Sequence, residues 1–265
     1  MNKQDFLDSY LKYGIKEENV CFSRIGVKGC DLEDICVIAP LHKVEAYTQF
    51  GAKVTKLSFG YYPCYKVEYK NKTFNFITTQ IGAPNADEIV VALAFSNCKK
   101  IIFTGSCGGL ETKFNIGDIL LPEFSISGDG ATMYYTKGEI KDNFTFGKKF
   151  YPTKDLNEKL IEYFNEINLD YSFVGNISID TIVGQFFHID EFRKMGAEVV
   201  EMETASVFCL AEMLDMEAVA ILNISDSTAS SKSLLAGRTK EELELHVKTE
   251  NYTVPKLVLG FIEKL

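Results

Sequence analysis

The sequence has few of the residues that commonly hold metals or form crosslinks. Among its 265 residues there are three histidines, His42, His188 and His246, and the seven cysteines are scattered without a Cys-x-x-Cys pair. Such spacing fits neither a zinc site nor a disulfide framework. We therefore expect no bound metal and a reduced, cytoplasmic setting.

Long apolar runs and a positive charge surplus are missing as well. The most hydrophobic stretch, residues 207–224, is interrupted by Glu212, Asp215 and Glu217, so no membrane span is expected. Residues 1–14 mix charges through every turn, unlike a secretory signal. The net charge of −9 would repel a phosphate polymer, which argues against a nucleic-acid partner.

No repeat, low-complexity tract or linker divides the chain, so we predict a single domain over 1–265, with 1–34 as its N-terminal extension. The predicted fold is α/β, a single-domain α/β/α sandwich with a central mixed sheet. Strands are expected at 35–40, 99–105, 117–127, 171–180 and 217–226, with a hairpin over 64–82. Helices are expected to open near Asn85 and at Thr153 as N-cap, and to cover 203–215 and 239–265, the last interrupted near Pro255.

The stretch "IIFTGSCGGL" (101–110) ends a strand in a cluster of glycines. Glycines allow the backbone to approach a ligand closely, and successive N–H groups can hold an anion, with Ser106 as a further donor. A tight turn without ligand is the competing interpretation. No lysine follows the glycines, which excludes a Walker-type phosphate loop.

Two carboxylates flank a methionine in "VVEMETASVF" (199–208). In an extended segment Glu201 and Glu203 point to one side and Met202 to the other. A carboxylate at the bottom of a pocket suits the two hydroxyls of a ribose. A solvated helix N-terminus explains the same residues equally well.

A third candidate is Asp226, which follows the apolar strand in "ILNISDSTA" (221–229). Partial desolvation there would raise its pKa and allow it to protonate a departing group. A helix-capping or turn-forming aspartate is the alternative.

In this order and spacing, the segments resemble the nucleoside phosphorylase superfamily. The resemblance is to the branch with hexameric purine nucleoside phosphorylases, uridine phosphorylases and adenosylhomocysteine nucleosidases. It runs from about Ile35 to the C-terminus. Its landmarks are "TGSCGGL" followed by "NIGDILLP", then "SGDGAT", "VGNISIDT", "VVEMETASVF", "NISDS" and "AGRTKEEL".

The resemblance implies roles for the ribose side and for the leaving group. Met202 would pack under the sugar, Glu203 would accept its hydroxyls, and Glu201 would lie beside them. Asp226 would protonate or hydrogen-bond N7 of a purine. Arg238, twelve residues further on, would assist it.

Further residues would contact the acceptor and the base. By the same resemblance, Ser106 and the backbone of Gly105 face the phosphate or an attacking water. Ile182 stands where the family often has an aromatic residue stacked on the base, and Val200 lines the base pocket. Gln185 resembles the glutamine with which the uridine branch binds uracil.

The acceptor side departs from the phosphorylase pattern. Phe103 stands where phosphorylases usually have an arginine, and "IAPLHKVEAY" (38–47) replaces the Gly-Asp-Pro-x-x-Arg signature. Lys43, or else His42, is our candidate to replace the missing cation. Glu45 is the nearest match to the glutamate that activates water in the nucleosidases.

The predicted function is phosphorolysis of a nucleoside, preferably a purine one, to a free base and ribose 1-phosphate. No cofactor is expected beyond inorganic phosphate as co-substrate, and the resemblance implies a homo-oligomer, a dimer-based trimer or hexamer. The alternatives are a nucleosidase that uses water and a nucleoside-binding protein without catalysis.

Overall fold

Ten strands of one mixed sheet run through the middle of the computed structural model, which describes residues 1–58 and 61–265. The main strand order is β10-β6-β8-β9-β5-β1-β4-β3-β2, and β7 pairs with β6. The strands are β1 (Ile35–Pro40), β2 (Lys53–Lys56), β3 (Cys64–Tyr69), β4 (Lys72–Thr79), β5 (Lys100–Gly109), β6 (Ile119–Gly128), β7 (Lys149–Phe150), β8 (Ser172–Ile179), β9 (Val199–Glu201) and β10 (Glu217–Ser227).

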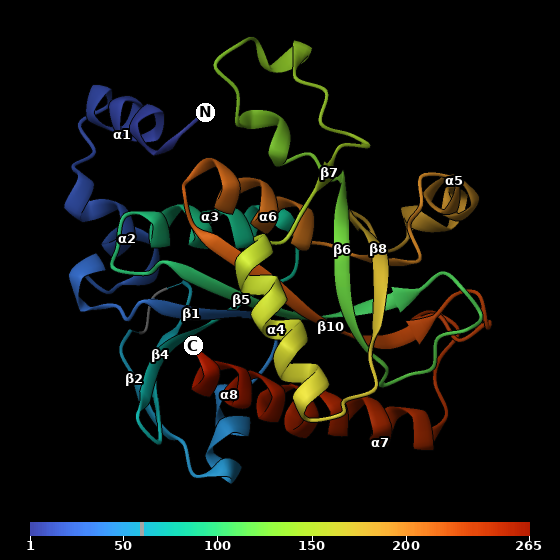
Figure 1. Ribbon diagram of the computed structural model, residues 1–265. Helices are drawn as coiled ribbons and strands as arrows, with labels where there is room; N and C mark the ends of the chain where they lie inside the picture. The colour runs from blue at the N-terminus through green and yellow to red at the C-terminus, as the bar shows by residue number, and fades with distance from the viewer. Residues whose placement is uncertain (59–60) are drawn as a thin grey trace.

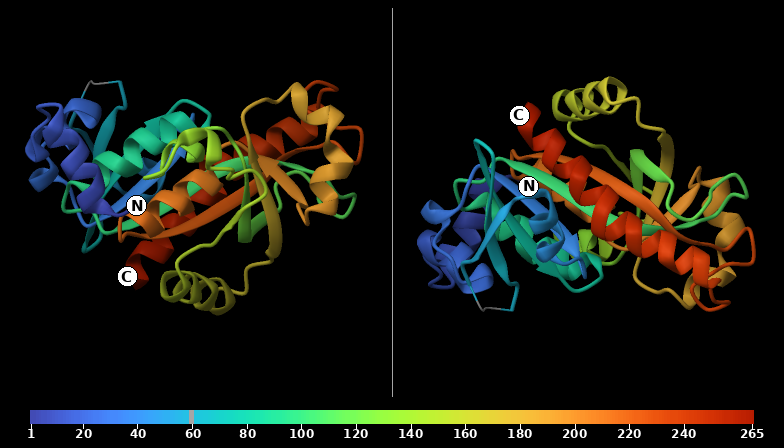
Figure 2. Two further views of the ribbon diagram at one scale, coloured as in Figure 1. Left: turned by 90° about the horizontal axis from the view of Figure 1, so that it is seen from above. Right: turned by 90° about the horizontal axis from the view of Figure 1, so that it is seen from below.

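Helices cover both faces of this sheet, which confirms the predicted α/β/α layering (Figure 1). Helices α2, α3 and α6 pack together on one face, and α4 and α8 pack together on the other. The N-terminal helices lie at one end of the molecule and α5 at the opposite end (Figure 2). The helices are α1 (Lys3–Lys12), α2 (Glu17–Ile25), α3 (Ala83–Ala94), α4 (Lys154–Glu166), α5 (Ile189–Lys194), α6 (Thr204–Met213), α7 (Lys240–Lys248) and α8 (Val254–Lys264).

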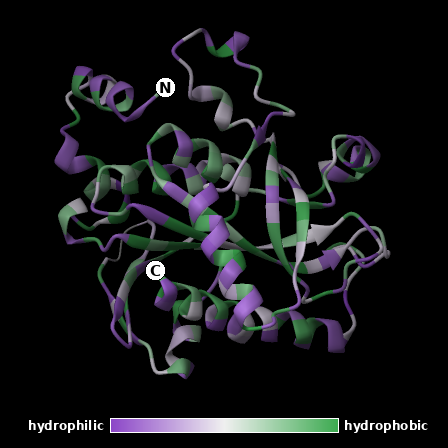
Figure 3. Ribbon diagram, in the orientation of Figure 1, coloured by the Kyte–Doolittle hydropathy of each residue, from purple (hydrophilic) through white to green (hydrophobic). Residues whose placement is uncertain are grey.

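The core follows from the apolar strands at the centre of the sheet. Every residue of β1 is buried, as expected for a parallel strand with helices on both faces. Figure 3 shows the central strands as largely hydrophobic and α1 as rich in hydrophilic residues. No helix in the described part of the chain is long and apolar enough to cross a bilayer.

One part of the sheet closes on itself, a feature that the sequence did not predict. β5 pairs with both β10 and β9, while β10 pairs with β6, β6 with β8, and β8 with β9. These five strands form a ring. The ring brings the carboxyl ends of β5 and β10 next to β9 and the start of α6.

The glycine cluster belongs to a strand and not to a turn. β5 continues through Gly109, because it pairs with β10 on one side and with β9 on the other up to that residue. An added Cβ at Gly108 would lie 3.4 Å from both Asp226 Oδ2 and Val200 Cγ1. Gly108 therefore leaves room for these neighbours, and the predicted strand end at the glycines is wrong.

The predicted local elements otherwise agree with the structure, with two instructive differences. The hairpin forms with Tyr69 opposite Lys72, and α3 begins at Ala83, two residues before the expected Asn85. Thr153 does occupy the N-cap position of α4, but its hydroxyl accepts from the N–H of Ala218 at 2.9 Å instead of capping the helix.

The interruption expected near Pro255 is a π-helix, η6 (Thr249–Thr253), between α7 and α8. Pro255 lies in the first turn of α8 and has no N–H to continue the regular hydrogen-bond ladder. Wider π-type turns often occur at functional sites. This one contains Glu250, which lines the cavity described next.

Candidate active site

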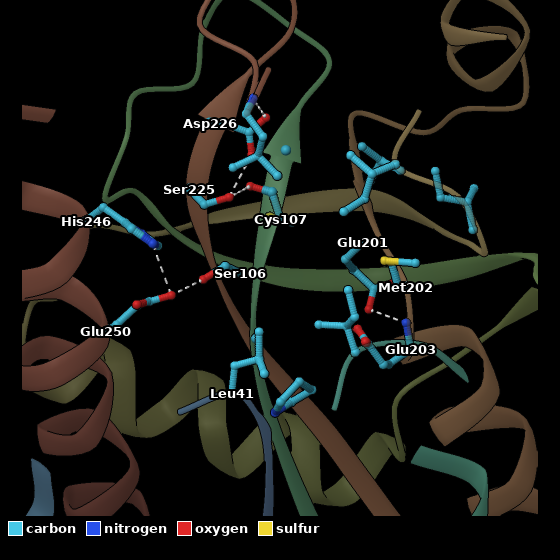
Figure 4. Close-up of a pocket in the computed structure, with 18 of the residues that line it drawn as sticks. Leu41, Ser106, Cys107, Glu201, Met202, Glu203, Ser225, Asp226, His246 and Glu250 are labelled. Atoms are coloured by element: carbon cyan, nitrogen blue, oxygen red, sulfur yellow. Dashed lines mark hydrogen bonds and ion pairs between the residues drawn. The ribbon is translucent and has the colours of Figure 1, made fainter. Parts of the chain in front are cut away.

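A cavity of about 260 Å³ lies where β1, β5, β9 and β10 end beside α7. Figure 4 shows its side chains converging from these separate elements. Every predicted site residue lines it except Lys43 and Glu45, and those that do are His42, Gly105, Ser106, Ile182, Gln185, Val200, Glu201, Met202, Glu203, Asp226 and Arg238. We call Glu201, Met202 and Glu203 the ribose wall, after the ribose that the sequence led us to expect there.

Glu201 is held rigidly within the ribose wall. Its Oε2 accepts from the backbone N–H groups of Glu203 and Thr204, both at 2.8 Å, and from the Thr204 hydroxyl. Its Oε1 accepts from Asn176 at 2.7 Å and from Ser178. Glu201 thus caps the N-terminus of α6 and positions the residues that follow.

Glu203 is the carboxyl group of this wall with capacity for a ligand. It is buried at the N-cap position of α6, and its Oε1 accepts from the N–H of Gly82 at 2.5 Å. Burial, followed by the negative charge of Glu201, raises the pKa of Glu203 to about 8. A carboxyl group that is protonated near neutral pH can donate to one hydroxyl of a diol and accept from the other.

Asp226 reaches the cavity because β10 contains a bulge. Ile224 pairs with Cys107 and Asp226 with Gly108, so Ser225 is an extra residue in the strand. Such bulges change the direction of side chains beside active sites. The Ser225 hydroxyl donates to Asp226 Oδ1 at 2.7 Å, and the N–H of Leu234 donates to Oδ2 at 3.1 Å.

The environment of Asp226 favours a proton on its carboxyl group. Burial raises the pKa of Asp226, and this effect outweighs the hydrogen bonds from Ser225 and Leu234 and the positive charge of Arg238. The Arg238 guanidinium itself donates to the Ser225 carbonyl at 2.9 Å. Arg238 therefore supports the bulge and lies close to Asp226. The structure of the described residues contains no ion pair between these two side chains.

Opposite the ribose wall lies a cluster that sequence reasoning missed in part (Figure 4). The Ser106 hydroxyl donates to Glu250 Oε1 at 2.8 Å. His246 Nε2 lies 3.2 Å and His42 Nε2 lies 3.6 Å from the same oxygen. We call Ser106, His42, His246 and Glu250 the acceptor wall, after the acceptor that Ser106 and His42 are expected to contact.

Electrostatics in the acceptor wall favour a charged glutamate. Burial alone would raise the pKa of Glu250, but His42, Ser106 and His246 together hold it below its usual value. Burial lowers the pKa of His246, against the charge of Glu250, which raises it. Glu250 and His246 are four residues apart on one helical face, a spacing that could have indicated the pair in the sequence.

Phe103, Lys43 and Glu45 do not line this cavity. Phe103 is fully buried in the core on one face of the sheet, with its ring under Gly105. Lys43 and Glu45 line a neighbouring hollow beyond His42. Among the described residues that line the main cavity, Arg238 is the one lysine or arginine.

The residues expected to contact the base, Ile182, Val200 and Gln185, line the cavity together with the apolar side chains of Ile179 and Leu234. The Gln185 amide donates to the Ile182 carbonyl at 2.8 Å, so one of its hydrogens is already used within the chain. No group of histidine, cysteine and acidic residues in the described ranges has the arrangement of a metal site.

Comparison with known proteins agrees with this architecture. The phosphorylase superfamily model matches residues 32–263. The chain is 27% identical over 198 residues to a DeoD-type purine nucleoside phosphorylase of Limosilactobacillus reuteri, covering 71% of this chain and 74% of that protein.

Two solved structures share the fold. Uridine phosphorylase from Vibrio fischeri superposes with a TM-score of 0.73 at 16% identity, over 89% of this chain and 94% of that one. A 5'-methylthioadenosine/S-adenosylhomocysteine nucleosidase from Helicobacter pylori superposes with a TM-score of 0.69 at 18% identity, over 89% and 100%. Phosphorylases and nucleosidases thus have this fold in common, and the family model spans most of the sequence: the chain belongs to the phosphorylase superfamily.

Proposed function

We propose that this protein cleaves the N-glycosidic bond of a purine nucleoside with phosphate, releasing the free base and ribose 1-phosphate. The observation that carries the proposal is the pairing of two buried carboxyl groups, Glu203 and Asp226, in one cavity with raised pKa values. Groups with strongly shifted pKa values are concentrated at functional sites, and here two of them line the same cavity.

The proposed reaction uses the two groups at opposite ends of the nucleoside. Glu203 binds the ribose hydroxyls, and Met202 packs under the sugar. As the bond from C1′ to the base nitrogen breaks, its electron pair moves into the purine ring and Asp226 gives a proton to N7. A phosphate oxygen then bonds to C1′, whose positive charge develops in the transition state.

The acceptor and the base are supported by different observations. The matched purine nucleoside phosphorylase relative supports phosphate as acceptor and a purine as base. The raised pKa of Asp226 supports a leaving group that needs a proton. Ser106 and the N–H of Gly105 are the proposed phosphate donors, with the His42 imidazole beside them and Lys43 in the hollow behind it.

The decisive experiment incubates the protein with a panel of purine and pyrimidine nucleosides, with and without phosphate, and identifies the sugar product. Ribose 1-phosphate formed only in the presence of phosphate supports the proposal. Free ribose formed at a rate independent of phosphate contradicts it.

One contact favours hydrolysis as a second candidate function. Glu250 is held as an anion beside Ser106, where the acceptor should bind, and a carboxylate in this position can remove a proton from water. In this case Glu250→Gln would abolish the formation of free ribose while leaving nucleoside binding intact.

We further propose a homo-oligomer, a dimer-based trimer or hexamer, with subunit contacts near the cavity. Large apolar side chains next to lining residues support it: Val183, Phe187 and Leu235 are 64%, 85% and 65% exposed. Exposed apolar groups of this size often mark contact surfaces. Light scattering of the purified protein tests the oligomeric state.

The remaining proposals concern cofactors and location. We propose that the reaction needs no cofactor other than phosphate as co-substrate, and dialysis against a chelator before the assay tests this. A cytoplasmic setting is supported by the seven cysteines, which are all unpaired among the described residues.

A further inference from the structure

Three contacts converge on a single oxygen of Glu250. Its Oε1 accepts from Ser106 at 2.8 Å and lies 3.2 Å from His246 and 3.6 Å from His42. Within the described residues, Oε2 makes no hydrogen bond or ion pair. Glu250 therefore has one oxygen fixed by the protein and a second one that can accept from a ligand.

The charges around this carboxylate disfavour an oxyanion that carries no proton. His42, His246 and Arg238 are the cationic or potentially cationic groups of the cavity, while Asp226 and Glu250 face it from β10 and η6. Phe103 carries no charge, and its ring is buried in the core away from the cavity. A fully deprotonated oxyanion placed beside Ser106 would lie against the Glu250 carboxylate without a dedicated guanidinium to offset the repulsion.

We propose that Glu250 selects the acceptor by its hydroxyl group, so that phosphate binds with a P–OH donating to Glu250 Oε2. The inference rests on the proposed phosphorolysis and specifies which form of the acceptor the site takes. An ionised carboxylate can only accept hydrogen bonds. It attracts an oxyanion that carries a proton and repels one that carries none.

Sulfate is the probe that separates these two cases. It has the tetrahedral shape and nearly the size of phosphate, but it carries no proton at neutral pH. Sites built to bind a hydroxyl reject an analogue without it by as much as ~10⁴-fold, because buried polar groups are left unpaired. Repulsion of the wrong ligand is a common source of such specificity.

The experiment measures sulfate as an inhibitor against phosphate in the phosphorolysis assay. All assays are run at one pH, so that the protonation of His42, His246, Arg238 and Asp226 does not vary between them. We expect the wild-type inhibition constant for sulfate to exceed the KM for phosphate at least ~100-fold. In Glu250→Gln, whose amide can donate, sulfate should compete within about tenfold of the phosphate KM.

The control is Glu241→Gln, which removes an exposed carboxylate from helix α7 away from the cavity. It should reject sulfate as strongly as the wild type. Calorimetric titration of wild-type protein with phosphate and with sulfate gives a second measurement, which needs no variant. Phosphate should bind and sulfate should not.

Three results would overturn the proposal, and they are distinguishable. If turnover requires phosphate but sulfate competes equally well in the wild type, or if Glu250→Gln keeps the wild-type selectivity, Glu250 does not select the acceptor. If free ribose forms without any need for phosphate, the proposed function fails and this inference fails with it.

Discussion

The ribose wall and the acceptor wall face each other across one cavity, but the first consists of consecutive residues and the second of residues far apart in the sequence. Glu201, Met202 and Glu203 are consecutive residues at the junction of β9 and α6. Ser106 and Glu250 come from β5 and from the π-helix, and meet at 2.8 Å although they are 144 residues apart. A single local motif can indicate the first wall, whereas only the folded chain assembles the second.

The two walls also treat their carboxylates differently. Glu203 is buried beside a second carboxylate, and its pKa is raised to about 8. Glu250 is surrounded by Ser106 and two histidines, and its pKa is lowered. The ribose wall thus presents a group that can hold a proton, and the acceptor wall presents an anion. This contrast suits a site where hydroxyls bind on one side and a proton-bearing acceptor on the other.

The largest effect is expected at Asp226, which lies between the two walls. Asp226→Asn cannot protonate the leaving group, so kcat on an unactivated purine nucleoside should fall roughly 10²–10⁴-fold. Steady-state kinetics measure it, with Asp170→Asn, an exposed loop residue, as the control. On a substrate with an activated leaving group, which needs no proton, kcat of the variant should fall much less. Near-normal kcat on natural nucleosides would remove Asp226 from the mechanism.

The ribose wall is tested by removing the hydroxyl acceptor. Glu203→Ala should lower kcat/KM on ribonucleosides roughly 5- to 150-fold, since it removes two hydrogen bonds to the ribose hydroxyls, each worth about 0.5–1.5 kcal/mol. The loss should shrink on 2′,3′-dideoxynucleosides, which have no hydroxyls for Glu203 to bind. Equal losses on both substrate types, in a folded variant, would mean that Glu203 does not contact the ribose.

The acceptor wall is tested by comparing two neighbouring basic side chains, those of His42 and Lys43. His42 lines the cavity and Lys43 lines the hollow behind it. His42→Asn should raise the KM for phosphate about tenfold, the value of one charge-assisted hydrogen bond, with little change in the nucleoside KM. Lys43→Ala should raise the phosphate KM less. The reverse order would place the acceptor on the Lys43 side.

The smallest expected effect is a pH dependence of stability in the ribose wall. The folded state binds the Glu203 proton more tightly than the unfolded state, whose pKa is near 4.5. This stabilisation is complete below about pH 4.5 and is lost as the pH rises through about 8. The melting temperature of the wild type relative to Glu203→Gln should therefore fall by several °C between pH 5 and pH 8.

Thermal unfolding of both proteins at intervals across this range measures the difference. Taking the difference between the two proteins cancels the contributions of other buried acids, such as Asp87 and Asp129, whose pKa values are also raised. A difference that is constant with pH would show that Glu203 is ionised in the folded protein at neutral pH.

Predictions from the sequence succeeded where the signal is local. The strand at 35–40 and the hairpin over 64–82 follow from apolar runs and turn residues, and β1, β3 and β4 form there. These predictions failed where the local structure depends on a neighbouring strand that is distant in the sequence. β5 continues through its glycines because β9 and β10 pair with it, and Thr153 bonds to Ala218 because β10 lies beside the start of α4.

The sequence by itself determined the α/β architecture and the family, and it singled out Glu201, Met202, Glu203 and Asp226, which line the cavity, because these features depend on hydrophobic periodicity and on short motifs. Tertiary structure decided the acceptor wall. Ser106, His42 and Glu250 converge only when β5 and β1 pair in the sheet and the π-helix carries Glu250 against their carboxyl ends. Contacts between residues so far apart leave no periodic trace in the sequence, since their spacing depends on how the whole sheet closes.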